Sequence, residues 1–280
     1  MLTRILTAGV LIPLLILILF FSGTVVFPIA WALLGVMAVC EMLRALGVLR
    51  DVCLTFPAYP IALGMPFAAY YLSDVKSIWL ILFGALTFFL LWLYTVAIFR
   101  RGALLFSSVS SIFTSVLYIA VGFLSISLLR YHTEAGKYLY LLVFIAPWVT
   151  DTFAYFTGRF LGRHKLIPEI SPKKTVEGAI GGTLFGILSF VVFGLIMRFS
   201  LGHDPNYVVL AISGALCAFI SQIGDLIASL IKREKGVKDY GSIFPGHGGV
   251  MDRFDSVLAT APLLYAIFSI GGVFTALTLL

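Results

Sequence analysis

The chain has 280 residues, of which 61% are hydrophobic and only 11% are charged, and its formal net charge at pH 7 is +6. Its mean hydropathy of +1.08 excludes a soluble globular domain, because too little polar surface would remain to face water. The composition therefore predicts a protein that is embedded in a membrane.

Apolar segments long enough to cross a membrane occur along the whole chain. A helix of about 18 residues or more spans the ~30 Å hydrocarbon core of a bilayer. The alternating pattern of a membrane β-barrel is absent, so we expect helical spans. Nine such segments lie at residues 5–22, 24–46, 54–73, 77–99, 107–130, 138–162, 176–199, 207–233 and 254–280. The predicted fold is an all-α polytopic membrane protein with about nine transmembrane helices.

The first apolar segment follows Arg4, an arrangement that also occurs in secretory signals. No small-x-small cleavage site ends the segment, and further apolar segments follow it. We therefore expect a first helix that is retained in the protein.

The sequence predicts a single membrane domain over residues 1–280, because no Pro- or Ser-rich linker and no obvious repeat divides it. Residues 1–130 contain few charges and are expected to be mainly scaffold helices. The helices and cytoplasmic loops that carry the chemistry are expected within residues 138–280. Glu41 stands out in the scaffold, and a salt bridge with Arg44 three residues later or a functional role would each explain it.

Basic residues predict the orientation of the chain, because with nine spans the N-terminus and alternate connections lie on one side. Fifteen of the 19 lysines and arginines fall on that side. They are Arg4, Arg44, Arg50, Arg100, Arg101, Arg159, Arg163, Lys165, Lys173, Lys174, Lys232, Arg233, Lys235, Lys238 and Arg253. The positive-inside rule places these residues in the cytoplasm and the C-terminus outside. The pI of 9.3 then reflects this asymmetry of basic residues and their attraction to anionic lipid headgroups, and it does not indicate nucleic-acid binding.

Charged residues are concentrated in residues 229–255, between two apolar segments. This run holds the cations Lys232, Arg233, Lys235, Lys238 and Arg253, the carboxylates Glu234, Asp239, Asp252 and Asp255, and His247. Ionisable groups at a membrane boundary or in a cavity within the membrane are costly to place there. Such a cluster therefore indicates a functional site.

Two carboxylates near this run are candidate metal ligands. Asp225 lies about two turns before the basic end of its segment, and Asp252 lies at the start of the next segment. Facing helix ends could bring the two carboxylates to one Mg²⁺, which is usually held by one or two carboxylates together with substrate phosphates. The alternative is that each aspartate pairs with a nearby lysine or arginine.

The Gly-rich loop at 245–249 is a candidate phosphate site. Glycines at 246, 248 and 249 permit positive φ and let backbone N–H groups approach an anion. We expect Gly248 and Gly249 to be more sensitive to substitution than Gly241. His247 is either a ligand, a donor to phosphate or a loop histidine with its hydrogen bonds satisfied.

A second polar region, Ser171 to Gly178, also contains residues that could bind phosphate. Hydroxyl groups and lysines precede an acidic residue there, which predicts a capped helix start with cytoplasmic anchors or a share of a phosphate site. Asp151 is a lone carboxylate within an apolar segment. It is expected to line a cavity or to pair with an interior cation.

Residues 229–255 resemble the signature of the phosphatidate cytidylyltransferases, the CDP-diacylglycerol synthases. The matching pattern is Ser-x-Ile-Lys-Arg-x₄-Lys-Asp-x-Gly-x₂-Phe-Pro-x-His-Gly-Gly-Val-x-Asp-Arg-Phe-Asp, and no defining position departs from it. The Ser171–Gly178 and Asp151 regions also resemble this family. The similarity extends over about 150–262, whereas the first five segments match only in hydropathy and length.

The resemblance implies transfer of the cytidylyl group from CTP to phosphatidic acid, with Mg²⁺ held by Asp225 and Asp252. A second metal site, occupied by K⁺, and a homodimer are also expected. The residues expected to act in catalysis are Asp225, Asp252, Lys238 and Arg253. Those expected to bind substrates are Ser171, Lys174, Thr175, Glu177, Lys232, Arg233, Asp239, His247, Gly248, Gly249 and Asp255. The expected location is a bacterial-type inner membrane, with the active site facing the cytoplasm.

Other functions are compatible with parts of this pattern. Related enzymes transfer a phosphoryl group from CTP to a polyprenol or phytol, or cytidylylate an archaeal ether lipid, but they are not expected to carry the whole signature. A lipid or ion transporter also uses intramembrane Asp and Lys residues. Transporters of that kind usually have inverted repeats and midplane sites, and neither is apparent in the sequence.

Overall fold

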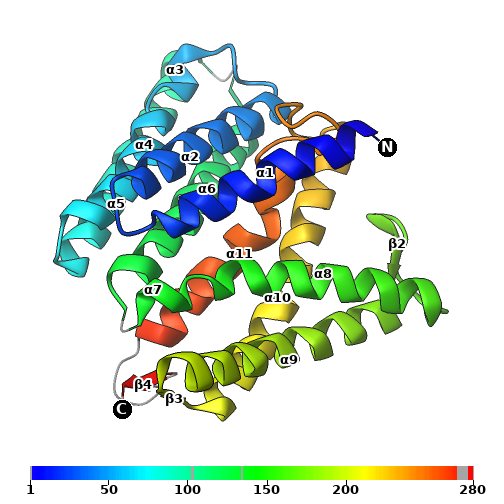
Figure 1. The fold of residues 1–280 in the computed structure, drawn as a ribbon. Coiled ribbons are helices and arrows are strands. Elements are labelled where there is room, and N and C mark those ends of the chain that lie inside the picture. The colour runs from blue at the N-terminus through cyan, green and yellow to red at the C-terminus, as the bar shows by residue number, and fades with distance from the viewer. Residues whose placement is uncertain (1, 102–103, 134, 270–276, 280) are drawn as a thin grey trace. The chain divides into compact units, whose positions relative to one another are not determined.

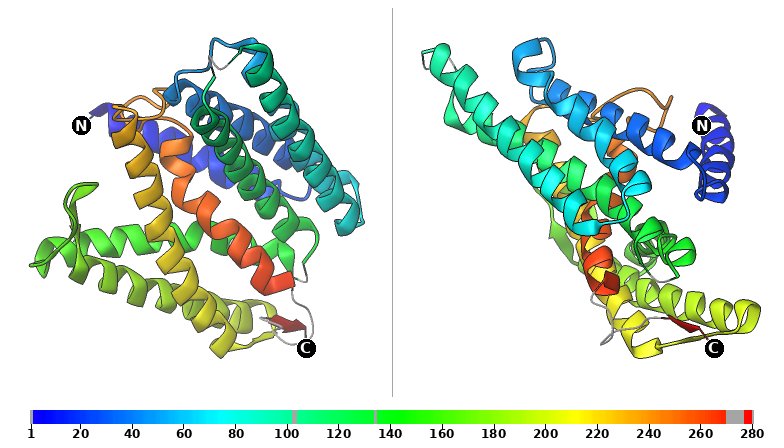
Figure 2. Two further views of the ribbon diagram at one scale, coloured as in Figure 1. Left: turned by 180° about the vertical axis from the view of Figure 1, so that it is seen from behind. Right: turned by 90° about the vertical axis from the view of Figure 1, so that its left-hand side faces the viewer.

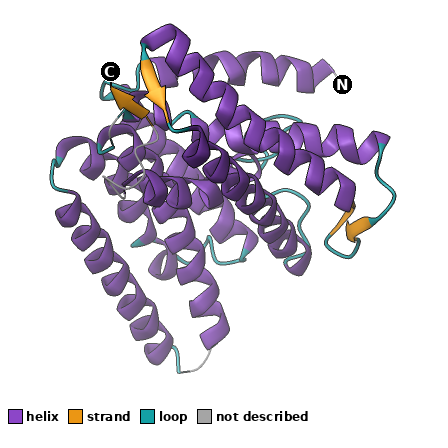
Figure 3. Cartoon of the chain, turned by 90° about the horizontal axis from the view of Figure 1, so that it is seen from below, coloured by secondary structure: helices purple, strands orange, loops and turns teal. Residues whose placement is uncertain are grey.

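The structure is a computed structural model that describes residues 2–101, 104–133, 135–269 and 277–279. Most of these residues are helical, and the strands are short (Figure 3). Within the described residues, seven helical segments are long and apolar enough to cross a membrane. The prediction of an α-helical polytopic membrane protein is therefore confirmed, whereas the number of nine spans stays a prediction.

The chain forms two compact units. Unit 1 comprises Met1–Tyr131 and Glu234–Phe254, and unit 2 comprises His132–Arg233 and Asp255–Leu280. The boundary falls within helix α11 (Met251–Ser269), near the start of the helix. The expected single domain, with scaffold in 1–130 and catalytic parts in 138–280, stays a prediction.

Unit 1 is a helical bundle whose members follow the predicted apolar segments. Its helices are α1 (Leu2–Phe20), α2 (Val26–Ala45), α3 (Val52–Thr55), α4 (Ala58–Tyr71), α5 (Val75–Phe99) and α6 (Phe106–Tyr131). Helices α3 and α4 together form one apolar span. Helices α2, α4 and α6 pack against one another, and α5 packs against α4 and α6 (Figure 1).

Aromatic side chains form the core of unit 1. Trp31 of α2 is fully buried, stacks on Phe27 with ring centroids 4.4 Å apart, and meets Phe123 of α6 edge-on at 6.3 Å. Phe254, in the first turn of α11, lies 6.2 Å from Trp31 and 5.8 Å from Phe123. Offset and edge-on aromatic pairs of this kind add to the energy of burial. They hold the start of α11 against α2 and α6.

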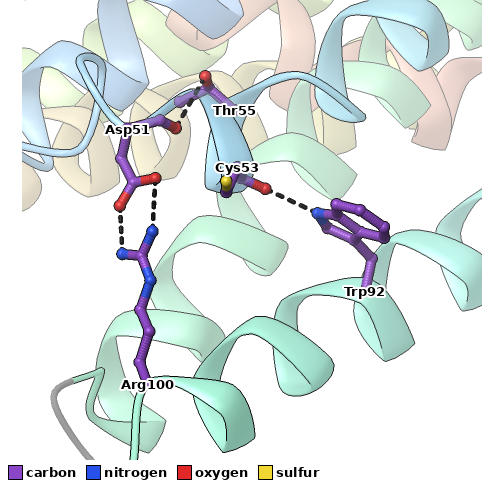
Figure 4. A network of polar contacts seen from close by, with 5 residues as sticks. All are labelled: Asp51, Cys53, Thr55, Trp92 and Arg100. Carbon is purple, nitrogen blue, oxygen red and sulfur yellow. Dashed lines mark hydrogen bonds and ion pairs between the residues drawn. The ribbon is translucent and has the colours of Figure 1, made fainter.

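At one end of unit 1, polar contacts join the α2–α3 connection to the end of α5 (Figure 4). The Arg100 guanidinium donates to both carboxylate oxygens of Asp51, with Nη2 2.8 Å from Oδ1. This hydrogen-bonded ion pair lowers the pKa of Asp51. Nearby, the Trp92 indole N–H donates to the carbonyl of Cys53 at 2.6 Å, and the Thr55 hydroxyl donates to the Asp51 carbonyl at 3.1 Å.

A second set of contacts joins the α1–α2 connection to the end of α6. Arg130 Nε donates to the hydroxyl of Ser22 at 2.9 Å, and the Tyr131 hydroxyl donates to the Ser22 carbonyl at 2.9 Å. Tyr70, near the end of α4, lies edge-on to Tyr131 with a centroid distance of 5.2 Å. Connections that alternate along the chain therefore meet one another in unit 1, as expected for successive membrane spans.

Unit 2 contains the next three predicted segments and two small β-sheets. Its elements are α7 (Gly136–Leu139), α8 (Leu142–Phe160), β1 (Lys165–Ile167), β2 (Ser171–Thr175), α9 (Val176–Leu201), β3 (His203–Pro205), α10 (Tyr207–Glu234) and β4 (Leu277–Leu279). Strands β1 and β2 form an antiparallel hairpin between α8 and α9, and Lys165 Nζ donates to the Pro172 carbonyl at 2.8 Å. The hairpin follows the end of α8 and precedes α9 (Figure 2), and these strands were not among the elements predicted from the sequence.

Glycines let α8 and α9 approach closely. Gly178, Gly182 and Gly186 are four residues apart, so they lie along one side of α9. A Cβ atom at Gly182 would lie 2.7 Å from the Thr150 carbonyl oxygen and 2.9 Å from the Cβ of Ala154. Small residues at this spacing are typical of close helix pairs in membranes. The close packing fixes the hairpin between the two helices.

The last predicted segment, 254–280, is partly corrected. Helix α11 is described over Met251–Ser269, and residues 270–276 and 280 lie outside the described residues. Residues 277–279 are not helical, because β4 pairs antiparallel with β3. Within the described chain, α11 is not among the seven long apolar helices, and α1 contributes only the shorter apolar stretch Gly9–Phe20.

Candidate functional site

The Gly-rich loop of unit 1 is a tight turn with two left-handed residues. The Phe244 N–H donates to the Gly248 carbonyl at 3.0 Å, and the His247 N–H donates to the Phe244 carbonyl at 2.8 Å. Gly246 has φ +77° and Gly248 has φ +81°. Only glycine adopts this conformation without strain. The expected positive φ is therefore confirmed at these two positions, whereas Gly249 is not in the left-handed region.

Asp252 ties the two ends of this loop together. Its Oδ2 accepts the Tyr240 N–H at 2.8 Å and the Gly249 N–H at 3.0 Å. Asp252 lies in the first turn of α11, where the helix dipole favours an anion. The carboxylate is thus held in a fixed position, and the loop is fixed with it.

Glu41 of α2 also binds this loop, through contacts that sequence reasoning missed. Its side chain is buried, with an exposure of 1%, and its two oxygens accept the Val250 N–H at 3.0 Å and the Met251 N–H at 2.9 Å. These backbone contacts give Glu41 partners other than Arg44, whose salt bridge was one of the two explanations left open for this residue. The feature of the sequence that could have indicated these contacts is that a carboxylate is rare in an apolar span.

The polar side chains of the loop differ in their surroundings. Arg253 is exposed, and its Nε donates to the His247 carbonyl at 2.8 Å. The Nδ1 atom of His247 is buried and has no hydrogen-bond partner within the described part of the chain. The role of His247 as a ligand, a phosphate donor or a loop histidine stays a prediction. Lys238 and Asp239 are exposed to solvent.

In unit 2, Lys174 and Asp225 form an ion pair. Lys174 lies near the end of β2 and Asp225 in α10, and Lys174 Nζ is 2.5 Å from Asp225 Oδ2. Both side chains are partly buried, with exposures of 25% and 31%. The pairing that was the alternative to metal binding is thus present for Asp225.

The second polar region forms the capped helix start that the sequence predicts. Thr175 is the N-cap of α9, and its hydroxyl oxygen accepts the Gly178 N–H at 3.1 Å. Glu177, in the first turn of α9, contacts His164 before the hairpin, with Oε1 2.7 Å from Nδ1. Ser171 begins β2 and is partly buried. These contacts order the segment that carries Lys174.

Asp255 is the buried member of a charged group in unit 2. Its Oδ1 accepts the Ser256 N–H at 2.7 Å. The carboxylates of Asp225 and Asp151 repel that of Asp255, and the Lys232 ammonium attracts it. Asp151 and Arg233 are exposed, so the expectation that Asp151 lines a cavity stays a prediction.

The predicted site residues are divided between the two units. Unit 1 contains Lys238, Asp239, His247, Gly248, Gly249, Asp252 and Arg253. Unit 2 contains Asp151, Ser171, Lys174, Thr175, Glu177, Asp225, Lys232, Arg233 and Asp255. In the described ranges, no three side chains of His, Cys, Asp or Glu are grouped to hold a metal ion. The shared metal role of Asp225 and Asp252 stays a prediction.

Comparison with known proteins decides the family. The profile described as "Cytidylyltransferase family" matches residues 2–271. The chain belongs to the cytidylyltransferase family. A relative from Bacillus subtilis is named "Phosphatidate cytidylyltransferase" and is 33% identical over 271 residues, which cover 95% of this chain and 97% of the relative.

Two further members of the cytidylyltransferase family carry the same name. The protein from Staphylococcus haemolyticus is 39% identical over 176 residues and that from Staphylococcus saprophyticus is 40% identical over 177 residues. Each match covers 63% of this chain, and the chain spans 64% of each relative's length. The family match reaches residue 2, so the view that the first five segments resemble the family only in hydropathy and length is too narrow.

Proposed function

We propose that the protein transfers the cytidylyl group of CTP to phosphatidic acid, giving CDP-diacylglycerol and pyrophosphate in phospholipid biosynthesis. The observation that carries this proposal is the family match over residues 2–271, together with the near full-length similarity to the Bacillus subtilis protein named phosphatidate cytidylyltransferase. The ordered Gly-rich loop at 245–249, next to basic residues, supports it, because such loops suit the phosphates of a nucleotide.

The proposed reaction needs positioning and charge stabilisation more than acid–base chemistry. An oxygen of the anionic phosphatidate attacks the α-phosphorus of CTP, and the bond between that phosphorus and the bridging oxygen to the β-phosphate breaks. The electron pair leaves with pyrophosphate. No Ser or His nucleophile is required. The cations proposed to offset charge on the leaving group are Lys174, Lys232, Arg233, Lys238 and Arg253.

We propose Asp225 and Asp252 as the Mg²⁺ ligands. Carboxylate oxygens are the hard donors that Mg²⁺ prefers, and two of them with substrate phosphates suffice. Asp252 fits this role because two backbone N–H groups already hold its carboxylate in place. When bound, Mg²⁺ would neutralise negative charge on the phosphate groups. We also propose the second metal site, for K⁺, and the homodimer on the family resemblance alone.

The remaining substrate contacts are proposed from residue chemistry. The Gly248 N–H and the His247 side chain would donate to phosphate oxygens, and the orphaned Nδ1 of His247 supports a donor or ligand role. Gly249, whose N–H donates to Asp252, would frame the phosphate site. The other residues proposed to bind or frame the substrates are Ser171, Thr175, Glu177, Asp239, Asp255 and Asp151.

We propose nine spans in a bacterial-type inner membrane, with the N-terminus and the active site in the cytoplasm and the C-terminus outside. The alternating contacts of the connections in unit 1 support this topology. Side-specific reporters fused to either end test it. A cytoplasmic C-terminus would show that one span is miscounted.

One assay tests the proposed reaction. Purified full-length protein is incubated with radiolabelled CTP, phosphatidic acid and Mg²⁺, and we expect a lipid-soluble cytidine product together with pyrophosphate. An archaeal ether-lipid acceptor is tested in parallel for a cytidine lipid, and polyprenol and phytol are tested with CTP labelled in its γ-phosphate, because phosphoryl transfer would move that phosphate to the lipid and leave unlabelled CDP. None of these acceptors is expected to give a labelled lipid. Folded protein that forms no cytidine lipid from phosphatidic acid would exclude the proposed function.

A further inference from the structure

Unit 1 holds its Gly-rich loop with a carboxylate from a distant helix. Glu41 lies near the end of α2, and the loop residues that it binds are more than 200 positions away in the sequence. Each of its two oxygens accepts one backbone N–H, from Val250 or Met251. These N–H groups lie where α11 begins, and N–H groups in the first turn of a helix have no partner within the helix. Glu41 thus caps α11 from outside the loop.

Two loop glycines provide the space that Glu41 occupies. A Cβ atom at Gly241 would overlap with the Glu41 carboxyl group, and so would one at Gly249. Neither glycine has a positive φ, so backbone conformation does not explain either residue. The contact with Glu41 does explain them. The expectation that Gly241 is the less constrained glycine therefore overlooks this contact.

Glu41 and Asp252 act on the same stretch of backbone. Asp252 accepts from Tyr240 and Gly249, directly beside the positions that Glu41 contacts. Removing the Glu41 carboxylate would leave two N–H groups buried without their partner, and it would leave an empty space beside Gly241 and Gly249. Both changes lower stability locally. The position of Asp252 would then no longer be fixed.

We propose that Glu41 is a positioning residue for the nucleotide and metal site, which acts by fixing residues 240–251 and thereby the Asp252 carboxylate. This role rests on the proposed cytidylyl transfer. Glu41 itself touches no substrate, because its carboxylate is buried and both oxygens are engaged with backbone. The Gly-rich loop is shaped by α2 as well as by its own glycines.

The first test is the kinetics of Glu41→Ala and Glu41→Gln in the full-length enzyme. We expect Glu41→Ala to lower kcat/KM for CTP by about 10–100-fold, the range typical of groups that orient a metal ligand. It should also raise KM for CTP and the Mg²⁺ concentration that gives half-maximal activity. Glu41→Gln keeps the shape of the side chain but turns an NH₂ group towards a backbone N–H. Its kcat/KM for CTP should therefore lie between those of the wild type and Glu41→Ala. A smaller folded fraction lowers the apparent kcat alone and changes neither KM nor the Mg²⁺ requirement.

The second test is a double-mutant cycle with Gly241→Ala. Alone, Gly241→Ala should reduce activity, because its Cβ displaces the Glu41 carboxylate. In the Glu41→Ala background the Cβ has room, so the double variant should be no worse than Glu41→Ala. The matched control is Gly84→Ala in α5, where a Cβ meets nothing within 4 Å. It should leave the activity of either background unchanged.

The outcomes separate this proposal from the proposed function. Wild-type protein without cytidine-lipid product would remove the proposed function and the positioning role with it. If the wild type is active and Glu41→Ala keeps the wild-type KM for CTP and the wild-type Mg²⁺ requirement, the positioning role of Glu41 is overturned and the proposed function stands. Losses that multiply in the Glu41→Ala/Gly241→Ala variant would also overturn it.

Discussion

Asp225→Asn and Asp252→Asn are each expected to abolish turnover while the protein is made at near-normal levels. Each change keeps the size of the side chain but removes an anionic ligand from the proposed Mg²⁺ site. We expect kcat to fall by more than about 100-fold, beyond the range typical of outer-shell partners. Initial rates of cytidine-lipid formation over a range of Mg²⁺ concentrations measure the effect.

The control for these variants is Asp74→Asn. Asp74 caps α5 and accepts the Lys76 and Ser77 N–H groups, and asparagine caps a helix about as well as aspartate. Asp74→Asn should therefore keep wild-type rates. If Asp225→Asn or Asp252→Asn retains most of its activity at low Mg²⁺, its carboxylate is not a primary ligand. For Asp225 the ion pair with Lys174 would then be the main role.

Gly248→Ala is expected to have the second-largest effect, a loss of kcat/KM of at least about tenfold. A non-glycine residue with left-handed backbone costs about 1–2 kcal/mol, and Gly248 has φ +81°. The new Cβ would also lie 2.8 Å from Oδ2 of Asp252, so it would displace the carboxylate proposed to bind Mg²⁺. CTP-dependent initial rates and thermal unfolding in detergent, measured on the same preparation, separate the two effects.

Gly236→Ala is the control that separates the backbone strain from the steric clash with Asp252. Gly236 has φ +65°, and a Cβ there meets nothing within 4 Å. The Gly236→Ala variant should lose a similar amount of stability through backbone strain but keep the wild-type KM for CTP. Equal and small effects at Gly236 and Gly248 would mean that the loop is a simple turn, and the CTP site should then be sought around Ser171 to Glu177.

Features set by local sequence were the ones that could be predicted. Apolar length sufficed for helices such as α2 and α9, and the Ser/Thr-acidic pattern sufficed for the Thr175 cap. The glycine pattern likewise predicted left-handed residues, which the structure has at Gly246 and Gly248. These features depend on neighbours within a few residues, where propensity and capping rules apply.

Contacts between distant residues could not be predicted. Nothing local to Glu41 indicates that its partners are Val250 and Met251, and nothing local to Lys174 selects Asp225. The end of α11 was missed for a related reason. Residues 277–279 are apolar enough for a helix, but their backbone hydrogen bonds go to β3. Such pairings are decided by the tertiary structure, which overrides local propensity.

The contact between Glu41 and the loop also sets a time order for biogenesis. Its hydrogen bond to Val250 joins residues 209 positions apart. At about 5–20 residues per second of synthesis, α2 is made about 10–40 s before its partner leaves the ribosome. Throughout that interval the nascent chain carries an acidic group in an apolar helix without its final partners. The loop can close only after α11 has begun to emerge, so the segment proposed to bind the nucleotide is completed after helices α1 to α10 have been made.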